Sequence, residues 1–278
     1  MNGVRKPLLV ASDVDGTLID PLDRISDRTR RAVAAVRADG VPFVLATGRP
    51  PRWVHLISDE LELDGYAVTA NGALVYDVGE RRVVRSWLLE PPLLGDVASA
   101  LLKAIPGCAF AVERAPDGAA PTFVPDQPYG AFLAENGYTH AWPESRSVEV
   151  SRAEVLGQPA IKLLVRHEGM TSEEMSAAAE AVLAGAVGIT FSTSAGLIEL
   201  ASPGITKATG LAWVAEQLGV AQADVLAFGD MANDLEMIKW AGCGVAMANG
   251  LPELVALADE VTASNAEDGV AAVLERWF

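Results

Sequence analysis

Two aspartates one residue apart give this chain its clearest chemical potential. They stand in the stretch DVDGTL at positions 13–18, directly after the apolar run Leu8–Ser12. Such a run fits a strand buried on both faces of a sheet, and in open parallel sheets ligands bind beyond the carboxyl ends of the strands. Asp13 would then lie where a reacting group is needed, close to Asp15. One carboxylate could attack an electrophilic atom while the other donates and accepts a proton.

Two other interpretations of this stretch are an EF-hand calcium loop and an acidic turn exposed to solvent. The calcium loop requires Gly at its sixth position and Glu at its twelfth, and these positions hold Leu18 and Arg24. The EF-hand interpretation therefore fails. The solvated turn remains an alternative as long as this stretch is considered alone.

A second acidic segment, GDMANDLEM at positions 229–237, follows the apolar run Val225–Phe228. Asp230 and Asp234 straddle a turn in it and could face one cleft. Mg²⁺ in proteins usually takes one or two carboxylates together with phosphate oxygens and waters. The segment therefore predicts a magnesium site, and an acidic turn is again the alternative.

Two further features indicate binding of a phosphate group. Thr47 and Gly48 follow the predicted strand Val41–Ala46, where a hydroxyl and backbone N–H groups are suited to hold phosphate oxygens. A Thr-Gly turn is common, so this motif is weak alone. Lys207 begins a predicted helix, where the helix dipole disfavours a cation by about 0.3–1 kcal/mol. The lysine therefore either has an anion nearby or extends into water.

These features are more specific in combination than separately. Four carboxylates in one cleft (Asp13, Asp15, Asp230 and Asp234) would repel one another, since a like-charge pair about 4 Å apart costs about 4 kcal/mol at an effective dielectric constant near 20. A divalent cation and Lys207 would offset this repulsion. The same positive charges would neutralise a phosphoryl group during its transfer. The sequence thus predicts Mg²⁺ as the cofactor and a phosphorylated small molecule as the substrate.

The elements that carry these residues alternate between strand and helix, which predicts an α/β fold with a parallel sheet covered on both faces. Ser26 is expected to cap a helix over Asp27–Asp39. The other expected helices are Pro51–Leu61, Lys207–Leu218, Asp234–Trp240, Leu251–Ala258 and Asp268–Trp277. The other expected strands are Tyr66–Thr69, a hairpin of Ala73–Tyr76 and Val83–Trp87, Leu197–Ala201, Val225–Phe228 and Cys243–Met247. Between about residues 88 and 190 the spacing of strand-like and helix-like segments is less regular. We therefore predict a second α/β domain over 88–190, inserted into a core formed by 1–87 and 191–278.

The composition limits the classes of partner. The net charge of −16 argues against nucleic acid and anionic membranes, because both bind clustered Lys and Arg. No apolar run approaches the roughly 18 residues of a membrane span, and Leu8–Ala11 is shorter than the core of a signal peptide, about 7–15 residues. We therefore expect a cytoplasmic protein. Cys108 and Cys243 are expected to be reduced thiols. The sequence carries no signal of an oligomeric state.

The combination of motifs resembles the haloacid dehalogenase (HAD) superfamily of phosphohydrolases, and within it the Cof-type sugar and metabolite phosphatases. The motifs are DVDGTL, ATGR, ANGALVYD, GITKATGL, GDMANDLEM and the tail AMANG…ADEVTASNAEDGVAAVLE, and they span nearly the whole chain. The resemblance implies a Rossmann-like doubly wound core with an inserted α/β cap of type IIB, which would close over the cleft and select the substrate. One departure is Ala248-Asn249-Gly250, where the family usually has Gly-Asn-Ala.

The resemblance also implies a role for each matching residue. Asp13 would be the nucleophile and a metal ligand, and Asp15 the general acid/base that lends its backbone carbonyl to the metal. The other implied roles are phosphate binding by Thr47, Gly48, Lys207 and Asn233, metal binding by Asp230, and support of the metal site by Asp234. Arg49 and Asn71 are expected at the rim of the cleft.

These inferences predict a Mg²⁺-dependent phosphatase that hydrolyses phosphate monoesters of small metabolites, such as a sugar phosphate, through an aspartyl-phosphate on Asp13. Two alternatives remain: a phosphomutase of the same superfamily, and a catalytically silent ligand-binding protein on this fold. Substrate identity would depend on the inserted domain. Its cations Arg114, Lys162 and Arg166 could reach a distal group of the substrate, but solvated surface charge is the favoured interpretation of each.

Overall fold

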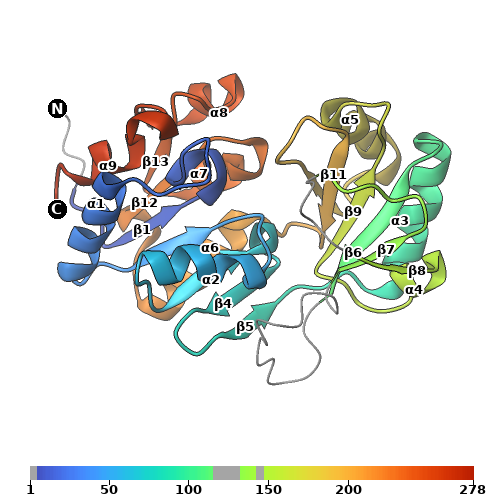
Figure 1. Ribbon diagram of the computed structural model, residues 1–278, viewed down its shortest axis with the longest axis horizontal. Helices are drawn as coiled ribbons and strands as arrows, with labels where there is room; N and C mark the ends of the chain where they lie inside the picture. Colours follow the sequence, from blue (N-terminus) through green and yellow to red (C-terminus); the bar gives the residue numbers. More distant parts are fainter. Residues whose placement is uncertain (1–4, 115–131, 142–146) are drawn as a thin grey trace. The chain divides into compact units, whose positions relative to one another are not determined.

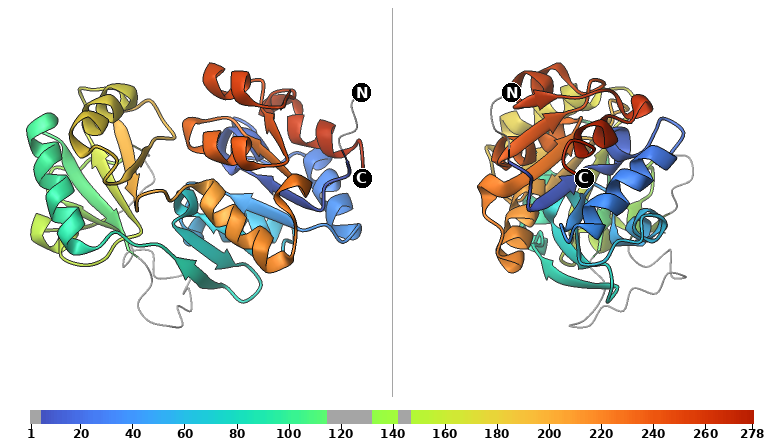
Figure 2. Two further views of the ribbon diagram at one scale, coloured as in Figure 1. Left: turned by 180° about the vertical axis from the view of Figure 1, so that it is seen from behind. Right: turned by 90° about the vertical axis from the view of Figure 1, so that its left-hand side faces the viewer.

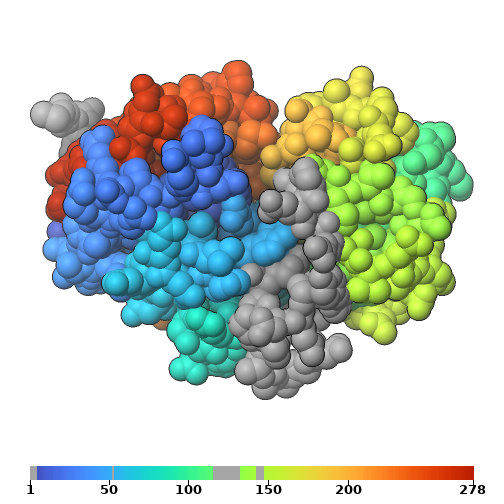
Figure 3. Space-filling model, in the orientation of Figure 1, coloured from blue at the N-terminus to red at the C-terminus, as the bar shows by residue number. Residues whose placement is uncertain are grey.

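The computed structural model describes residues 5–114, 132–141 and 147–278, which divide into two compact units. The core unit comprises Met1–Val84 and Thr206–Phe278, and the inserted unit comprises Arg85–Ile205. The core unit thus combines both ends of the chain, drawn in blue and red in Figure 1. In the space-filling view these blue and red parts lie directly against each other (Figure 3).

The core unit is built on one mixed sheet of eight strands. Their order across the sheet is β14-β13-β12-β1-β2-β3-β4-β5, with every pair from β14 to β3 parallel and β3 antiparallel to β4. The strands are β1 (Leu9–Ser12), β2 (Phe43–Ala46), β3 (Tyr66–Thr69), β4 (Leu74–Asp77), β5 (Arg82–Ser86), β12 (Val225–Gly229), β13 (Cys243–Ala246) and β14 (Glu260–Val261). Strand β1 lies between β12 and β2, so the two ends of the chain meet at the middle of the sheet.

Helices lie on both faces of this sheet, which confirms the predicted doubly wound α/β core (Figure 2). Two pairs of these helices pack side by side: α1 with α9, and α6 with α7. The core helices are α1 (Asp27–Ala38), α2 (Pro51–Glu60), α6 (Lys207–Leu218), α7 (Leu235–Trp240), α8 (Pro252–Leu257) and α9 (Gly269–Leu274). The predicted cap of α1 is confirmed, because the Ser26 hydroxyl accepts a hydrogen bond from the backbone N–H of Thr29 at 3.0 Å.

The inserted unit has its own sheet, with strand order β10-β11-β9-β6-β7-β8. Its strands are β6 (Ala109–Glu113), β7 (Phe132–Glu135), β8 (Val148–Val150), β9 (Lys162–Arg166), β10 (Gly188–Thr190) and β11 (Leu197–Ala201), and its helices are α3 (Pro91–Ala104), α4 (Arg152–Leu156) and α5 (Ser172–Leu183). Alternate residues of the strands, such as Phe110, Leu163 and Ile198, pack with the helices in one buried apolar cluster. A second α/β unit is therefore present in the middle of the chain.

The boundaries of this unit differ from the prediction of 88–190. We expected Leu197–Ala201 in the core sheet, but as β11 it pairs antiparallel with β9 and β10 in the inserted unit. The prediction was wrong because a short, fully buried and mostly apolar strand has the same sequence pattern in either sheet, so only its partner strands identify it. The chain returns to the core unit at Thr206, immediately before Lys207.

Two further observations concern the whole described chain. No helix among the described residues is long and apolar enough to span a membrane. Cys108 and Cys243 are both free thiols, the first buried and the second half-buried, as expected from the sequence.

Candidate active site

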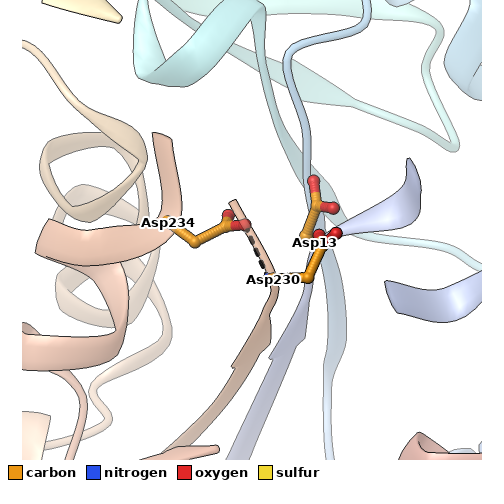
Figure 4. Close-up of side chains that lie close together, drawn as sticks. All are labelled: Asp13, Asp230 and Asp234. Atoms are coloured by element: carbon orange, nitrogen blue, oxygen red, sulfur yellow. Dashed lines mark hydrogen bonds between the residues drawn. The ribbon is translucent and has the colours of Figure 1, made fainter. Parts of the chain in front are cut away.

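Three aspartates lie together at the carboxyl ends of two neighbouring strands. Asp13 follows β1 and Asp230 follows β12, and these parallel strands are aligned so that Ser12 faces Phe228. Asp234 lies four residues further on. One carboxylate oxygen from each aspartate lies within 4.8 Å of the others, and the residues are at most 5% exposed. Figure 4 shows Asp13 beside Asp230, with Asp234 reaching toward them from the next turn.

Asp234 fixes the shape of the turn that follows β12. Its Oδ2 accepts hydrogen bonds from the backbone N–H groups of Asp230 and Met231, each at 3.0 Å. The turn passes so close that a Cβ atom on Gly229 would lie 2.5 Å from the Cβ of Asp234, so glycine is required there. Asp234 therefore holds the Asp230 backbone through one oxygen while its other oxygen stays free for a charged partner.

Lys207 supplies the positive charge of this cluster. It is the first residue of α6 and is completely buried, and its Nζ lies 2.5 Å from Asp13 Oδ1 and 2.6 Å from Asp234 Oδ1. Burial alone would lower the pKa of Lys207, but the two carboxylates raise it above its ordinary value, so the side chain stays charged. Of the two alternatives for this lysine, an anion nearby or extension into water, the structure shows the first.

The balance of charge in the cluster favours a divalent cation. Burial, together with Asp234 and Asp230, raises the pKa of Asp13 against the opposing effect of Lys207. Burial and then Asp234 raise the pKa of Asp230 to about 7, although a hydrogen bond of 3.0 Å from the Thr17 hydroxyl opposes this. Three ionised carboxylates and one ammonium would leave two negative charges in a buried space. An ion of charge +2 with a preference for oxygen ligands matches both the charge and the donor atoms.

Asp15 lies apart from this cluster. Its carboxylate is half-exposed and is bound by Arg49, with Nη2 2.5 Å from Oδ1 and Nε 2.9 Å from Oδ2. No side-chain oxygen of Asp15 belongs to the group formed by Asp13, Asp230 and Asp234 among the described residues. The fourth carboxylate predicted for the cleft is therefore neutralised by a different cation from the other three.

The loops after β2 and β3 place the remaining predicted residues. The Thr47 carbonyl accepts a hydrogen bond from the Asn71 backbone at 3.0 Å, and the Asn71 side-chain oxygen accepts one from Asn233 Nδ2 at 3.0 Å. A Cβ atom on Gly48 would lie 3.0 Å from that same oxygen. The loops after β2, β3 and β12 are therefore in close contact. Asn71, expected at the rim of the cleft, is only 4% exposed and lies inside this cluster of loops.

Sequence reasoning missed the side chains that hold the 13–19 loop from the far end of the chain. Asn249 donates to the carbonyl of Gly16 at 2.8 Å, and Asn265 donates to the carbonyl of Ile19 at 2.8 Å. Asn249 in turn accepts from the Asn265 backbone at 2.9 Å. Both asparagines stand in the motifs that carry the family resemblance, which was the available signal, but only the fold shows what they contact.

The interpretation of three cations of the inserted unit as solvated charge was wrong. Lys162 is 5% exposed and forms an ion pair of 3.0 Å with buried Glu199. Arg114 is also buried and donates to backbone carbonyls, among them those of Glu154 and Val155 at 2.8 Å. Arg166 donates to the carbonyl of Gly196 at 2.9 Å. Lys162 and Arg114 are therefore part of the interior of the inserted unit, whereas Arg166 is half-buried and bound to the backbone.

Comparisons with known proteins point to one family. Residues 10–274 match the family model described as haloacid dehalogenase-like hydrolase. YxeH of Bacillus subtilis, named as a phosphatase, is 31% identical over 268 residues, covering 95% of both chains. YitU of the same organism, named as a 5-amino-6-(5-phospho-D-ribitylamino)uracil phosphatase, is 30% identical over 276 residues, covering 98% of both.

Solved structures share the fold. A haloacid dehalogenase-like hydrolase from Bacteroides thetaiotaomicron is 25% identical, with a TM-score of 0.73 over 97% of this chain and 99% of that one. BT4131, described as a HAD subclass IIB sugar phosphatase, is 21% identical, with a TM-score of 0.79 over 97% and 98%.

Proposed function

This chain belongs to the haloacid dehalogenase-like hydrolases and is a phosphatase, and we propose that it hydrolyses phosphate monoesters of small metabolites with Mg²⁺ through an aspartyl-phosphate on Asp13. The observation that carries the proposal is the buried group of Asp13, Asp230 and Asp234 with Lys207 between two of them. In this group the proposed nucleophile, Asp13, lies among carboxylates whose negative charge exceeds the single positive charge of Lys207. A metal ion can offset the remainder.

The residues suited to hold Mg²⁺ are Asp13 and Asp230, together with the backbone carbonyl of Asp15. Asp234 supports them by fixing the turn on which Asp230 stands. When bound, the ion supplies positive charge that aligns the phosphate with the nucleophile and stabilises its oxygens during transfer.

Asp13 acts as the nucleophile in the first step of the proposed reaction. Lys207 holds its Oδ1, so the other carboxylate oxygen is available to attack phosphorus. The new bond joins this oxygen to phosphorus while the bond to the leaving alcohol breaks. Asp15, which takes up a proton from solvent before this step, gives that proton to the alcohol. Asp15, now ionised, accepts a proton from the water that attacks the acyl phosphate, which releases inorganic phosphate and regenerates Asp13.

Four residues are proposed to bind the phosphate oxygens during both steps: Thr47, Gly48, Lys207 and Asn233. The Thr47 hydroxyl oxygen already accepts a hydrogen bond from the Arg49 backbone at 3.0 Å, so its own hydrogen remains for the substrate. The Asn233 amide is oriented by Asn71. Backbone and side-chain donors fixed in this way stabilise developing charge without having to reorganise.

The proposed substrates are sugar phosphates and similar small phosphorylated metabolites. The support for this class comes from relatives, one named for a phosphorylated ribityl compound and one described as a sugar phosphatase. An alcohol as leaving group is consistent with a nearby carboxyl group that can protonate it.

A phosphate-release screen tests the proposal. The panel contains phosphorylated sugars, nucleotides, and flavin and pyridoxal phosphates, each assayed with chelator and with added Mg²⁺. We expect free phosphate to form without a bisphosphate activator, turnover to stop in chelator, and Mg²⁺ to restore it. Asp13→Asn should fold and bind metal but not turn over. Full activity in chelator, or in Asp13→Asn, would contradict the proposal.

A further inference from the structure

The side chain of Asp15 takes a different direction from that of Asp13, although the two residues are neighbours in the same turn. The backbone is extended at Asp15 (φ −77°, ψ 120°) and left-handed at Gly16 (φ 79°). A Cβ atom on Gly16 would lie 2.2 Å from Asp230 Oδ2, so the turn runs directly against the aspartate cluster. The loop that carries Asp15 therefore runs beside the cluster, whereas the Asp15 carboxylate is not part of it.

Arg49 is the side chain that holds the Asp15 carboxylate. Its guanidinium contacts both oxygens of Asp15, through Nη2 at 2.5 Å and through Nε at 2.9 and 3.2 Å. This two-pronged geometry fixes the plane of the carboxylate as well as its position, which a lysine cannot do. The side chain of Arg49 is only 20% exposed, in contrast to the half-exposed carboxylate that it binds.

The backbone of Arg49 is anchored independently of Asp15. Its N–H donates to the Thr47 hydroxyl at 3.0 Å, and its carbonyl accepts from the Ala70 backbone at 3.0 Å. Ala70 and Asn71 both have positive φ angles (50° and 56°), which are unfavourable for residues with a Cβ and persist only where surrounding structure enforces them. The turn after β3 thus fixes the base of the arginine, and the arginine fixes Asp15.

We propose that Arg49 is a positioning residue that keeps the Asp15 carboxylate out of the Asp13, Asp230 and Asp234 cluster and presents it to the leaving group of the substrate. Without the guanidinium, the divalent ion bound by the cluster would attract the free carboxylate, and the proton donor would be lost from the leaving-group side. This inference rests on the proposed function, in which Asp15 is the general acid. An ordinary surface ion pair would contribute little, typically about 0–1 kcal/mol to stability, and would not affect the proton transfer.

Two phosphate esters of similar size distinguish positioning of the acid from binding of the phosphate. p-Nitrophenyl phosphate releases a phenolate that needs no proton, whereas benzyl phosphate releases an alkoxide that does. With enzyme in excess over ester and Mg²⁺ present, release of the alcohol or phenol in a single turnover reports the first chemical step alone. The ratio of the two rates does not depend on how much of the variant is folded, because both are measured on one preparation.

We expect Arg49→Met to slow benzyl alcohol release about 100-fold and nitrophenol release about threefold or less, since a general acid typically contributes about 10²–10⁴-fold. Asp15→Asn should change the ratio in the same direction. The double variant should be no worse than Asp15→Asn, because the arginine acts through that carboxylate. Arg49→Lys, which keeps the charge but not the two-pronged contact, should fall between Arg49→Met and the unaltered protein.

Arg24 offers a matched control. It contacts Asp20 through Nε at 3.0 Å and Nη2 at 2.8 Å, a similar ion pair on the exposed surface. Arg24→Met should leave the rate ratio unchanged.

The outcomes separate this inference from the proposed function. If Arg49→Met slows both esters equally, or adds its full effect to that of Asp15→Asn, the arginine binds phosphate and the inference is overturned. If Asp15→Asn itself leaves the ratio unchanged, the assignment of Asp15 as acid fails, and the inference fails with it. If Asp13→Asn still releases both nitrophenol and benzyl alcohol, the aspartyl-phosphate mechanism fails. That result concerns the proposed function and is distinct from the two outcomes above.

Discussion

The ammonium of Lys207 lies 2.5 Å from a carboxylate oxygen of Asp13, although the two residues are 194 positions apart in the sequence. Both are buried, and the same ammonium lies 2.6 Å from Asp234. A charge in this position stabilises carboxylates that repel one another, and it does so before any metal ion or substrate binds. The stability of the core unit and its chemistry therefore depend on the same few groups.

Lys207→Met should destabilise the protein and abolish turnover. Removing one partner of a buried ion pair typically costs about 3–5 kcal/mol, because the other charge is left uncompensated. Mg²⁺ should recover more stability in this variant than in the unaltered protein, since the ion would replace the missing positive charge. The measurement is the free energy of unfolding in denaturant, with Mg²⁺ and with chelator.

Lys162→Met is the matched control for this prediction, because Lys162 is a second buried lysine, paired with Glu199 in the inserted unit. We expect it to lose stability as well, but to gain no more from Mg²⁺ than the unaltered protein does. Equal gains in Lys207→Met and the unaltered protein would show that Lys207 does not share the charge of the metal site.

The raised pKa of Asp230 predicts how stability depends on pH in the absence of metal. Burial and Asp234 raise the pKa from 3.8 to about 7 in the folded protein. A carboxyl group with a raised pKa favours the folded state while protonated, so its contribution is complete below its ordinary pKa and is lost as pH rises through about 7. In chelator, the protein should therefore become less stable between pH 5 and pH 7.5, on the order of a few kcal/mol for a shift of this size.

Asp230→Asn should have a smaller loss over the same pH interval and should be more stable than the unaltered protein at pH 7.5 in chelator. Saturating Mg²⁺ should reverse that order, because only the unaltered protein keeps this ligand. Identical pH dependence of the two proteins would assign the effect to other groups.

Gly16→Ala tests how closely the nucleophile loop must approach Asp230. The new Cβ would lie 2.2 Å from Asp230 Oδ2, and the residue would have to keep φ at 79°. Gly40→Ala is the control, with a φ of 77° and no atom within 4 Å of its Cβ. Both variants should lose about 1 kcal/mol from the left-handed conformation. Only Gly16→Ala should also lose Mg²⁺ affinity and turnover, measured by calorimetry and phosphate release.

Elements and site residues could be predicted from the sequence where a local pattern of apolar residues is followed directly by residues of a distinctive chemical type. Apolar runs followed by carboxylates located the ends of β1 and β12. The position of Lys207 at a helix start left a nearby anion and extension into water open, and only its combination with the acidic motifs favoured an anionic partner. The membership of β11 was not predictable, because its pairing with β9 is a long-range choice. The contact between Arg49 and Asp15 was hidden for the same reason, since the two residues are 34 positions apart and belong to different loops.

The interruption of the core unit by 121 residues of inserted unit, Arg85–Ile205, affects how the protein is made. During synthesis β1 and Asp13 leave the ribosome early, whereas β12, which pairs with β1, and Lys207 follow only after the whole insertion. Until then the nascent chain has a central strand with one edge unpaired and an aspartate without its counter-charge. Such exposed strand edges favour association between chains, so this interval is the stage of synthesis at which the core sheet is least protected against it.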